Sequence, residues 1–73
     1  MKVLREMRLT DTQRLVLLEP EEFEPRHTVA VEKSESQKKI LYCKDFCGSV
    51  EEAVIVFMKR SMFSGALAFT TVT

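Results

Sequence analysis

The N-terminal part of the chain carries the short apolar alternation that is typical of β-strands. Residues 3–9 (VLREMRL) and 14–19 (RLVLLE) are apolar at alternating or at all positions, and the turn-forming residues TDTQ separate them. This pattern predicts a β-hairpin. An amphipathic helix that begins at Thr10, with Gln13 completing a capping box, is the alternative, although Pro20 would end it early.

A second pair of strand-like segments follows, at residues 27–34 (HTVAVEKS) and 38–44 (KKILYCK), with the polar residues SESQ between them. In the first segment apolar and polar side chains alternate, which places Val29 and Val31 on one face and Glu32 on the other. We therefore expect a second hairpin.

The pattern changes to a helical one after residue 48. Ser49 and Glu52 have the spacing of a capping box, and acidic residues in a first turn favour the positive end of the helix dipole, so a helix should begin at Val50. Most apolar residues that follow fill an arc of about 200° on a helical wheel. They are Val50, Ala53, Val54, Ile55, Phe57, Met58 and Met62, and they lie opposite Glu52, Lys59 and Arg60.

Two apolar residues of this helix, Val56 and Phe63, fall on its polar side. Surplus apolar surface of this kind can mark a contact with a partner. The alternative is that a single helix covering a whole small sheet is buried over a wide arc.

Gly65 predicts the end of the helix, and the β-branched and aromatic residues 66–73 (ALAFTTVT) predict a last strand. The expected fold is therefore α+β, with a small antiparallel sheet of about four to five strands packed against one amphipathic helix at about residues 50–63. The length of 73 residues predicts a single domain, 1–73, with one small core.

Composition narrows the class of protein. With 45% hydrophobic and 30% charged residues the chain should fold rather than remain disordered. Its two cysteines are fewer than a disulfide-stapled secreted domain of this size would carry, and no secretion signal begins the chain, so we expect a reducing, cytoplasmic location. The apolar runs are too short to cross a membrane.

The charges cancel overall but are distributed unevenly. Eleven basic and eleven acidic residues argue against a protein that coats duplex nucleic acid, because such proteins depend on an excess of Lys and Arg. The segment EPEEFEPR, residues 19–26, is strongly acidic, and its two prolines predict a surface loop with Phe23 in its middle. A solvated connector is the plain alternative to a binding loop.

Candidate catalytic chemistry is sparse. Cys47 lies two residues before the helix cap, where a helix N-terminus can lower the pKa of a thiol. A thiol enzyme also needs a base, however, and the only histidine, His27, lies on a predicted strand. The spacing of Cys43 and Cys47 does not match a structural zinc site. Two glycines cannot supply a phosphate-binding loop or a dinucleotide fingerprint. We therefore expect no catalytic residues, no metal site and no cofactor, and two cysteines that behave as small hydrophobic residues.

With catalysis set aside, binding remains, either to another protein or to single-stranded nucleic acid. Lys38, Lys39 and Lys44 form a small basic strand around one stacking ring, Tyr42, which is the minimum of a single-stranded nucleic-acid platform. Such platforms usually carry several aromatic rings, so direct contact with nucleic acid is the second choice.

The chain resembles the small phage-encoded transcription regulators that bind host bacterial RNA polymerase. The resemblance covers the whole chain, from MKVLREMRL to GALAFTTVT, and includes the helix SVEEAVIVFMKRSMF. The resemblance lies in length, in the strand-rich layout with one helix and in the lack of a catalytic set. It implies binding near the N-terminus of the polymerase β′ subunit and at the β flap, displacement of the σ factor, and suppression of termination.

The acidic surfaces fit a basic polymerase segment. The candidate partner-binding residues are Asp45, Glu51, Glu52, Tyr42, Val56, Glu21 and Glu22.

Overall fold

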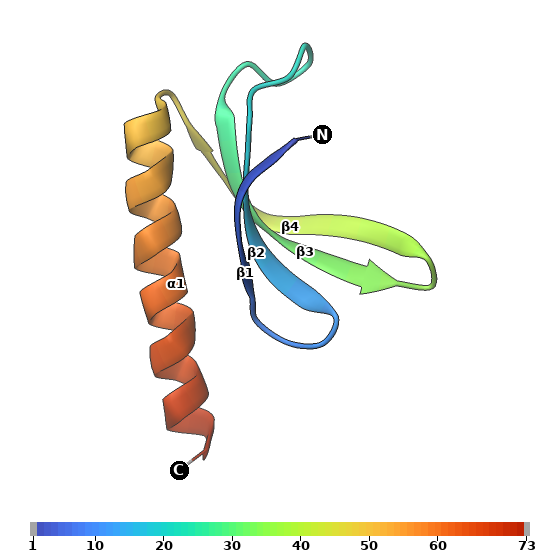
Figure 1. The fold of residues 1–73 in the computed structure, drawn as a ribbon, viewed down its shortest axis with the longest axis vertical. Helices are drawn as coiled ribbons and strands as arrows, with labels where there is room; N and C mark the ends of the chain where they lie inside the picture. The colour runs from blue at the N-terminus through green and yellow to red at the C-terminus, as the bar shows by residue number, and fades with distance from the viewer. Residues whose placement is uncertain (1, 73) are drawn as a thin grey trace.

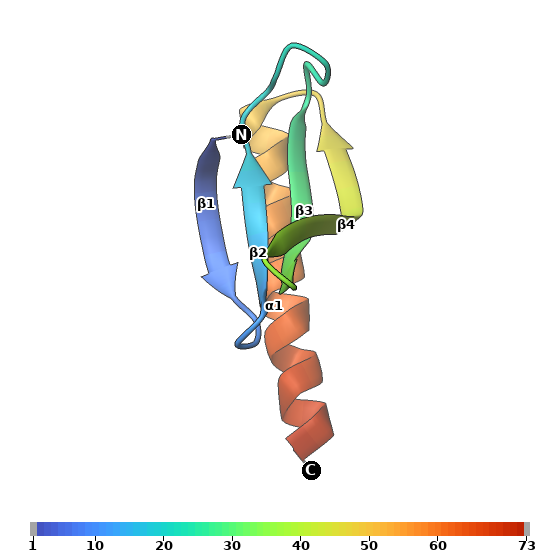
Figure 2. The same cartoon turned by 90° about the vertical axis from the view of Figure 1, so that its right-hand side faces the viewer.

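The computed structural model describes the backbone of residues 2–72 and the side chains of residues 2–62. It contains strands β1 (Val3–Arg8), β2 (Gln13–Leu18), β3 (His27–Glu35) and β4 (Lys38–Cys47) and the helix α1 (Val50–Val72). The strands form one antiparallel sheet in the order β1-β2-β3-β4, and α1 packs on one face of it (Figures 1 and 2). The predicted α+β class, with a four-stranded sheet and one helix, is confirmed.

Both predicted hairpins form, and their turns explain why. In the first, the Thr10 hydroxyl accepts hydrogen bonds from the backbone N–H groups of Thr12 (3.3 Å) and Gln13 (3.1 Å). This side chain therefore closes a turn and does not cap a helix. In the second hairpin Ser36 and Gln37 both have positive φ, 50° and 68°, as a two-residue type I′ turn requires.

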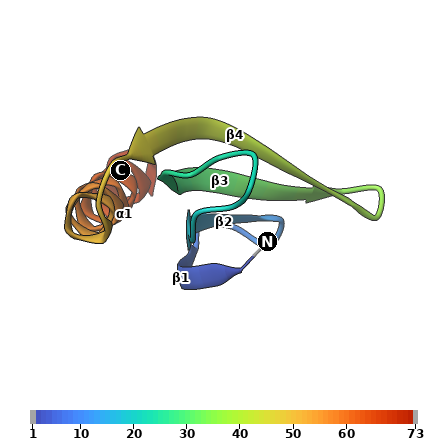
Figure 3. The same ribbon diagram turned by 90° about the horizontal axis from the view of Figure 1, so that it is seen from above.

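β4 bends at a β-bulge. Val29 lies opposite Asp45 and Val31 lies opposite Tyr42, so β4 contains one more residue than β3 between these pairs. Cys43, within the bulge, has a positive φ of 54°. Because a bulge increases the local twist, the far end of the β3–β4 hairpin turns away from the helix (Figures 1 and 3).

The centre of the sheet is buried on both faces, and Val29 and Val31 share one face, as the alternation of β3 predicts. On the helix side the core contains Leu15, Leu17, Val29 and Val31, together with Cys47, Ala53 and Phe57. On the opposite side Val16, Leu18 and Ala30 form a smaller cluster, against which Val3 of β1 and Leu41 of β4 pack.

The helix buries a narrower face than the sequence predicts. Ala53 and Phe57 are 0% and 8% exposed, and Val56 is half-buried against the core. In contrast, Ile55 is 52% and Met58 is 54% exposed. The prediction that Val56 lies alone on the polar side is therefore wrong, and the side chain of Phe63 lies outside the described residues.

Arg60 also lies on the sheet side of α1, where the sequence predicts the solvent side. Its guanidinium donates hydrogen bonds to the backbone carbonyls of Cys43 (2.7 Å) and Val29 (3.1 Å), and it pairs with the Asp45 carboxylate at 3.1 Å. Because a bulge interrupts the strand ladder, backbone carbonyls beside it can accept bonds from a side chain, and Arg60 ties the helix to the bend in β4.

The predicted strand over residues 66–73 is wrong, because α1 continues through Gly65 to Val72. A glycine inside a helix costs only about 1 kcal/mol relative to alanine, and Ala66, Leu67 and Ala68 are good helix formers. The C-terminal half of α1 extends past the end of the sheet (Figure 2).

The start of the helix confirms the predicted cap. The Ser49 hydroxyl accepts a hydrogen bond from the Glu52 N–H at 3.2 Å, and the Ser49 carbonyl accepts one from the Ala53 N–H at 3.1 Å. We expect Ser49→Ala to lower the free energy of unfolding by about 1 kcal/mol, because the hydroxyl acceptor is lost while the backbone bond remains. Thermal melting followed by circular dichroism measures this change. Ser34→Ala, at an exposed strand position, is the control, and an equal loss in both variants would contradict the role of the cap.

Candidate protein-interaction surface

The acidic segment predicted as a loop, residues 19–26, connects β2 to β3 and has a defined tip. The Glu21 N–H donates to the Glu24 carbonyl (2.8 Å), and the Glu24 N–H donates to the Glu21 carbonyl (3.2 Å). These two bonds leave Glu22 and Phe23 at the end of a tight turn. Phe23 is 92% exposed, so an aromatic ring with a carboxylate on either side in sequence projects into solvent.

Arg26 fixes the base of this loop. Its guanidinium donates two hydrogen bonds to the Glu24 carboxylate, at 2.6 and 3.3 Å, and stacks over the Phe46 ring with its carbon 4.5 Å from the ring centroid. The hydrogen bond raises the pKa of Arg26 and lowers that of Glu24. Because Phe46 belongs to β4, the loop is attached to the sheet through a side chain as well as through its two strands.

A hollow of about 150 Å³ lies between the loop and the outer face of the sheet. Its apolar wall comes from Leu18, Leu41 and Phe46, and its polar lining includes three carboxylates of the loop and one amine. The polar residues are Glu19, Glu21, Glu24, Thr28 and Lys44.

The start of α1 lies at the same end of the molecule as the acidic loop (Figures 1 and 2). Glu51 and Glu52 are exposed in its first turn and form no ion pair among the described residues. The loop tip (residues 21–24) and the helix start (residues 49–52) together form what we call the acidic end.

The structure separates the other predicted partner-binding residues from the acidic end. Asp45 is paired with Arg60, so it contributes to the attachment of the helix. Tyr42 and Val56 are half-buried and pack against the core between sheet and helix. Of the seven candidates, Glu21, Glu22, Glu51 and Glu52 lie at the acidic end, and Phe23 is the residue that charge alone did not select.

The predicted nucleic-acid platform is divided between the two faces of the sheet. Tyr42 packs on the helix side, whereas Lys44 lines the hollow on the opposite face and Lys39 lies 3.9 Å from the Glu32 carboxylate there. The ring and these two lysines therefore do not form one surface on which a base could stack.

The two cysteines have different environments. Cys47 is 2% exposed in the core, as expected of a small hydrophobic residue, but Cys43 is exposed in the bulge. Burial, together with the charges of Glu52 and Asp45, raises the pKa of the Cys47 thiol. The helix start therefore does not activate this thiol, and since folding raises its pKa, stability falls as the pH rises above the ordinary thiol range.

We expect iodoacetamide to modify Cys43 readily in the folded protein and Cys47 at least roughly tenfold more slowly, because Cys43 is exposed to the reagent whereas burial shields the Cys47 thiol and raises its pKa. Mass spectrometry of the digested protein measures both rates. The control is the denatured chain, in which both thiols should react. Equal rates in the folded state would contradict the burial of Cys47.

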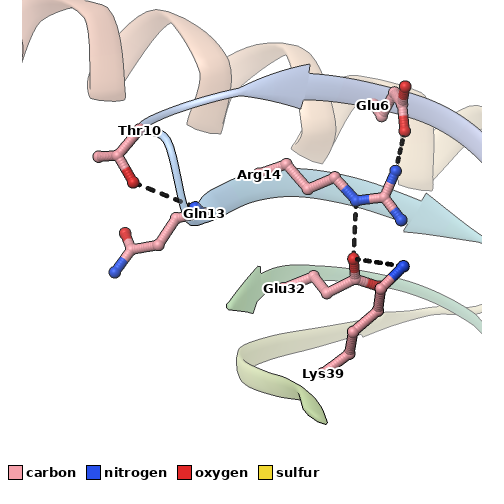
Figure 4. A network of polar contacts seen from close by, with 6 residues as sticks. All are labelled: Glu6, Thr10, Gln13, Arg14, Glu32 and Lys39. Carbon is pink, nitrogen blue, oxygen red and sulfur yellow. Dashed lines mark hydrogen bonds and ion pairs between the residues drawn. The ribbon is translucent and has the colours of Figure 1, made fainter. Parts of the chain in front are cut away.

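A second polar feature lies on the outer face of the sheet near the hairpin turns (Figure 4). The Glu32 carboxylate, whose side chain is 5% exposed, accepts a hydrogen bond from Arg14 at 2.7 Å and lies 3.9 Å from the Lys39 amine. Arg14 also pairs with Glu6 on β1. The network therefore joins all four strands, and its main hydrogen bond, to Glu32, raises the pKa of Arg14.

This network lines an open cavity of about 320 Å³ but offers little chemistry. Its carboxylates and cations pair with one another, and Arg14 and Lys39 both approach the same oxygen of the Glu32 carboxylate, Oε1. Alternation along the strands places Arg14 and Glu32 on the face opposite the helix, and the strand register, which the structure supplies, places them directly opposite each other.

Comparisons with protein-family models, with curated proteins and with solved structures find no match to this chain. Within the described residues, no group of three or more His, Cys, Asp and Glu side chains could hold a metal ion. In the same part of the chain, no helix combines the length and the apolar character needed to cross a bilayer. The fold and the acidic end define the chain as a small α+β domain with an exposed acidic and aromatic surface.

Proposed function

We propose that this protein is a phage-type regulator of host bacterial RNA polymerase that acts by protein–protein binding in the host cytoplasm. It blocks σ-dependent initiation and favours antitermination, as the resemblance of the chain to small phage transcription regulators implies. The polymerase contact is the acidic end, and the targets are the β′ N-terminal region and the β flap.

The single observation that supports this proposal is the tip of the 19–26 loop. The ring of Phe23 is 92% exposed, so its apolar surface is in contact with water, which is unfavourable for the free protein. The ring also contributes nothing to the core. Aromatic residues are common at the centres of protein interfaces. The Glu21–Glu24 hydrogen bonds hold the tip in one conformation, so less conformational entropy is lost on binding.

Charge supports the same partner chemistry. The loop tip and the helix start carry Glu21, Glu22, Glu24, Glu51 and Glu52, and Arg26 pairs with Glu24. Glu21 makes a further interaction, and the five carboxylates outnumber the one guanidinium, so the field at the acidic end is negative. A surface of this sign attracts a basic segment and repels the phosphates of nucleic acid.

Transcription from a σ-dependent promoter, with the polymerase holoenzyme and increasing amounts of the purified protein, tests the proposal. Inhibition of initiation, together with increased read-through at a terminator, supports it. Unchanged initiation at a large excess of protein would overturn the polymerase assignment. Capture of polymerase from a bacterial lysate should also survive nuclease treatment, whereas capture that depends on nucleic acid would support the alternative, a nucleic-acid-binding regulator.

A further inference from the structure

The side of α1 that faces away from the sheet carries an uncovered apolar stripe. Ile55, Met58 and Met62 are 52%, 54% and 73% exposed. No described side chain from the sheet covers them, since α1 packs on the sheet through Ala53 and Phe57. The stripe is not part of the core of this domain and requires a separate explanation.

The spacing of the stripe is that of a coiled-coil seam. Residues 51, 55, 58 and 62 are separated by four, three and four positions, which is the a/d repeat of a heptad. Ile55 and Met62 take a positions, whereas Glu51 and Met58 take d positions. The seam begins in the first turn of α1, where the sheet and the Ser49 cap already hold the helix in place.

The flanking charges select a partner and an orientation. Glu52 and Lys59 both occupy e positions, are exposed and form no ion pair among the described residues. In an antiparallel pair of helices e positions lie opposite e positions, so Glu52 of each copy meets Lys59 of the other when Ile55 packs against Met58. A parallel pair would instead place Glu51 against Glu51 in the seam and would leave both e charges without a partner of opposite sign.

We propose that this face of α1 binds a second copy of the chain, as an antiparallel two-stranded coiled coil. Its two-fold axis passes between Val56 and Phe57, and the Ile55–Met58 layer repeats on both sides of that axis. Two symmetry-related Glu52–Lys59 ion pairs flank these layers on the solvent side. The helix is preformed, so the association avoids the cost of helix nucleation.

The proposal does not rest on the proposed function. The dimer places Glu51 in its seam and pairs Glu52 with Lys59, so it covers the helix start, but it leaves the loop tip, with Glu22 and Phe23, exposed at both ends of the assembly. Polymerase binding through the loop is therefore compatible with the dimer, and each can fail without the other.

Sedimentation over a range of protein concentrations, with a charge-swap set, tests the dimer. The wild type should dimerise, whereas Glu52→Lys and Lys59→Glu should each weaken dimerisation by roughly tenfold or more, because each places like charges at both e pairs. A mixture of the two single variants should form a heterodimer as stable as the wild type, because one chain then carries lysine at both e positions and the other carries glutamate at both. Circular dichroism shows whether each variant is folded.

Met58→Lys is a second, independent variant: it places charge in the seam at an exposed position and should abolish the dimer without unfolding the domain. A wild type that remains monomeric at its highest attainable concentration would overturn the proposal. A mixture that is no more dimeric than its two components would also overturn it, because the association would then use another surface or another register.

Discussion

Glu32→Ala should lower the free energy of unfolding by about 2–3 kcal/mol, more than any other change of one charged residue described here. The Glu32 carboxylate is buried between Arg14 and Lys39, and its removal leaves the Arg14 guanidinium, whose side chain is only 31% exposed, without its closest partner. We place the cost below that of a fully buried ion pair because Arg14 keeps Glu6 and some contact with water. For a domain of this size the melting temperature should fall by roughly 10–20 °C.

Glu35→Ala is the matched control for this prediction. Glu35 lies on the same strand, is 57% exposed and pairs loosely with Lys33 at 3.8 Å, so its removal should change stability by about 0.5 kcal/mol or less. Glu32→Gln should lie between the two, because the amide oxygen can still accept a hydrogen bond from Arg14. If Glu32→Ala costs no more than Glu35→Ala, the outer face of the sheet is open to water.

If the protein binds polymerase as proposed, Phe23→Ala should weaken that binding by about 2 kcal/mol, roughly 30-fold, without a change in stability. A residue that is 92% exposed makes almost no contact within the domain, so its truncation should alter the free energy of unfolding by about 0.5 kcal/mol or less. Affinity measured by biolayer interferometry against the holoenzyme, beside a thermal melt, separates the two effects. A loss of stability in parallel with affinity would show that the ring packs within the domain.

Charge reversal at the loop tip tests the electrostatic part of the proposed polymerase contact. Glu22→Lys should slow association, and the effect should diminish as salt rises, because surface charges are screened over about 8 Å at physiological ionic strength. Asp11→Lys changes the net charge equally but lies in the β1–β2 turn, at the other end of the molecule (Figure 1), so it should bind as the wild type does. Equal weakening by both reversals would indicate that net charge, and not the acidic end, attracts the polymerase.

Reversal of Glu51 and Glu52 tests the helix start in the same assay. The structure makes Asp45 a poor probe of binding, because its pairing with Arg60 means that reversal would loosen the helix. The sequence assigned the Asp45 carboxylate to a partner, whereas in the structure it pairs with Arg60 of the same domain.

Local patterns predicted the elements of this protein where the physical cause is itself local. The Thr10 and Ser49 hydroxyls act on backbone groups within three residues, so the first turn and the helix cap could be placed from sequence. The alternation of Val29, Val31 and Glu32 assigned their faces because side chains on a strand point in opposite directions at successive positions. The two prolines of the acidic segment excluded a regular element there.

The same local reasoning failed where two outcomes have similar local energies. Residues 66–73 contain helix formers followed by β-branched residues, and whether they continue the helix depends on whether the sheet offers an edge to pair with. Within the helix, both Val56 and Met58 are apolar, so composition could not decide which of them faces the sheet.

The sequence by itself determined the second hairpin, the acidic loop and the start of the helix, because each follows from backbone hydrogen bonding and side-chain periodicity over a few residues. For the first hairpin it left a helix from Thr10 as an alternative, which the structure excludes. Only the tertiary structure decided that Glu32 is buried in a four-strand network, that Arg60 binds the bulge in β4, and that Ile55, Met58 and Met62 remain uncovered. These properties depend on the strand register and on the rotation of the helix over the sheet. Both are set by contacts between residues far apart in the chain, where no short-range pattern carries the information.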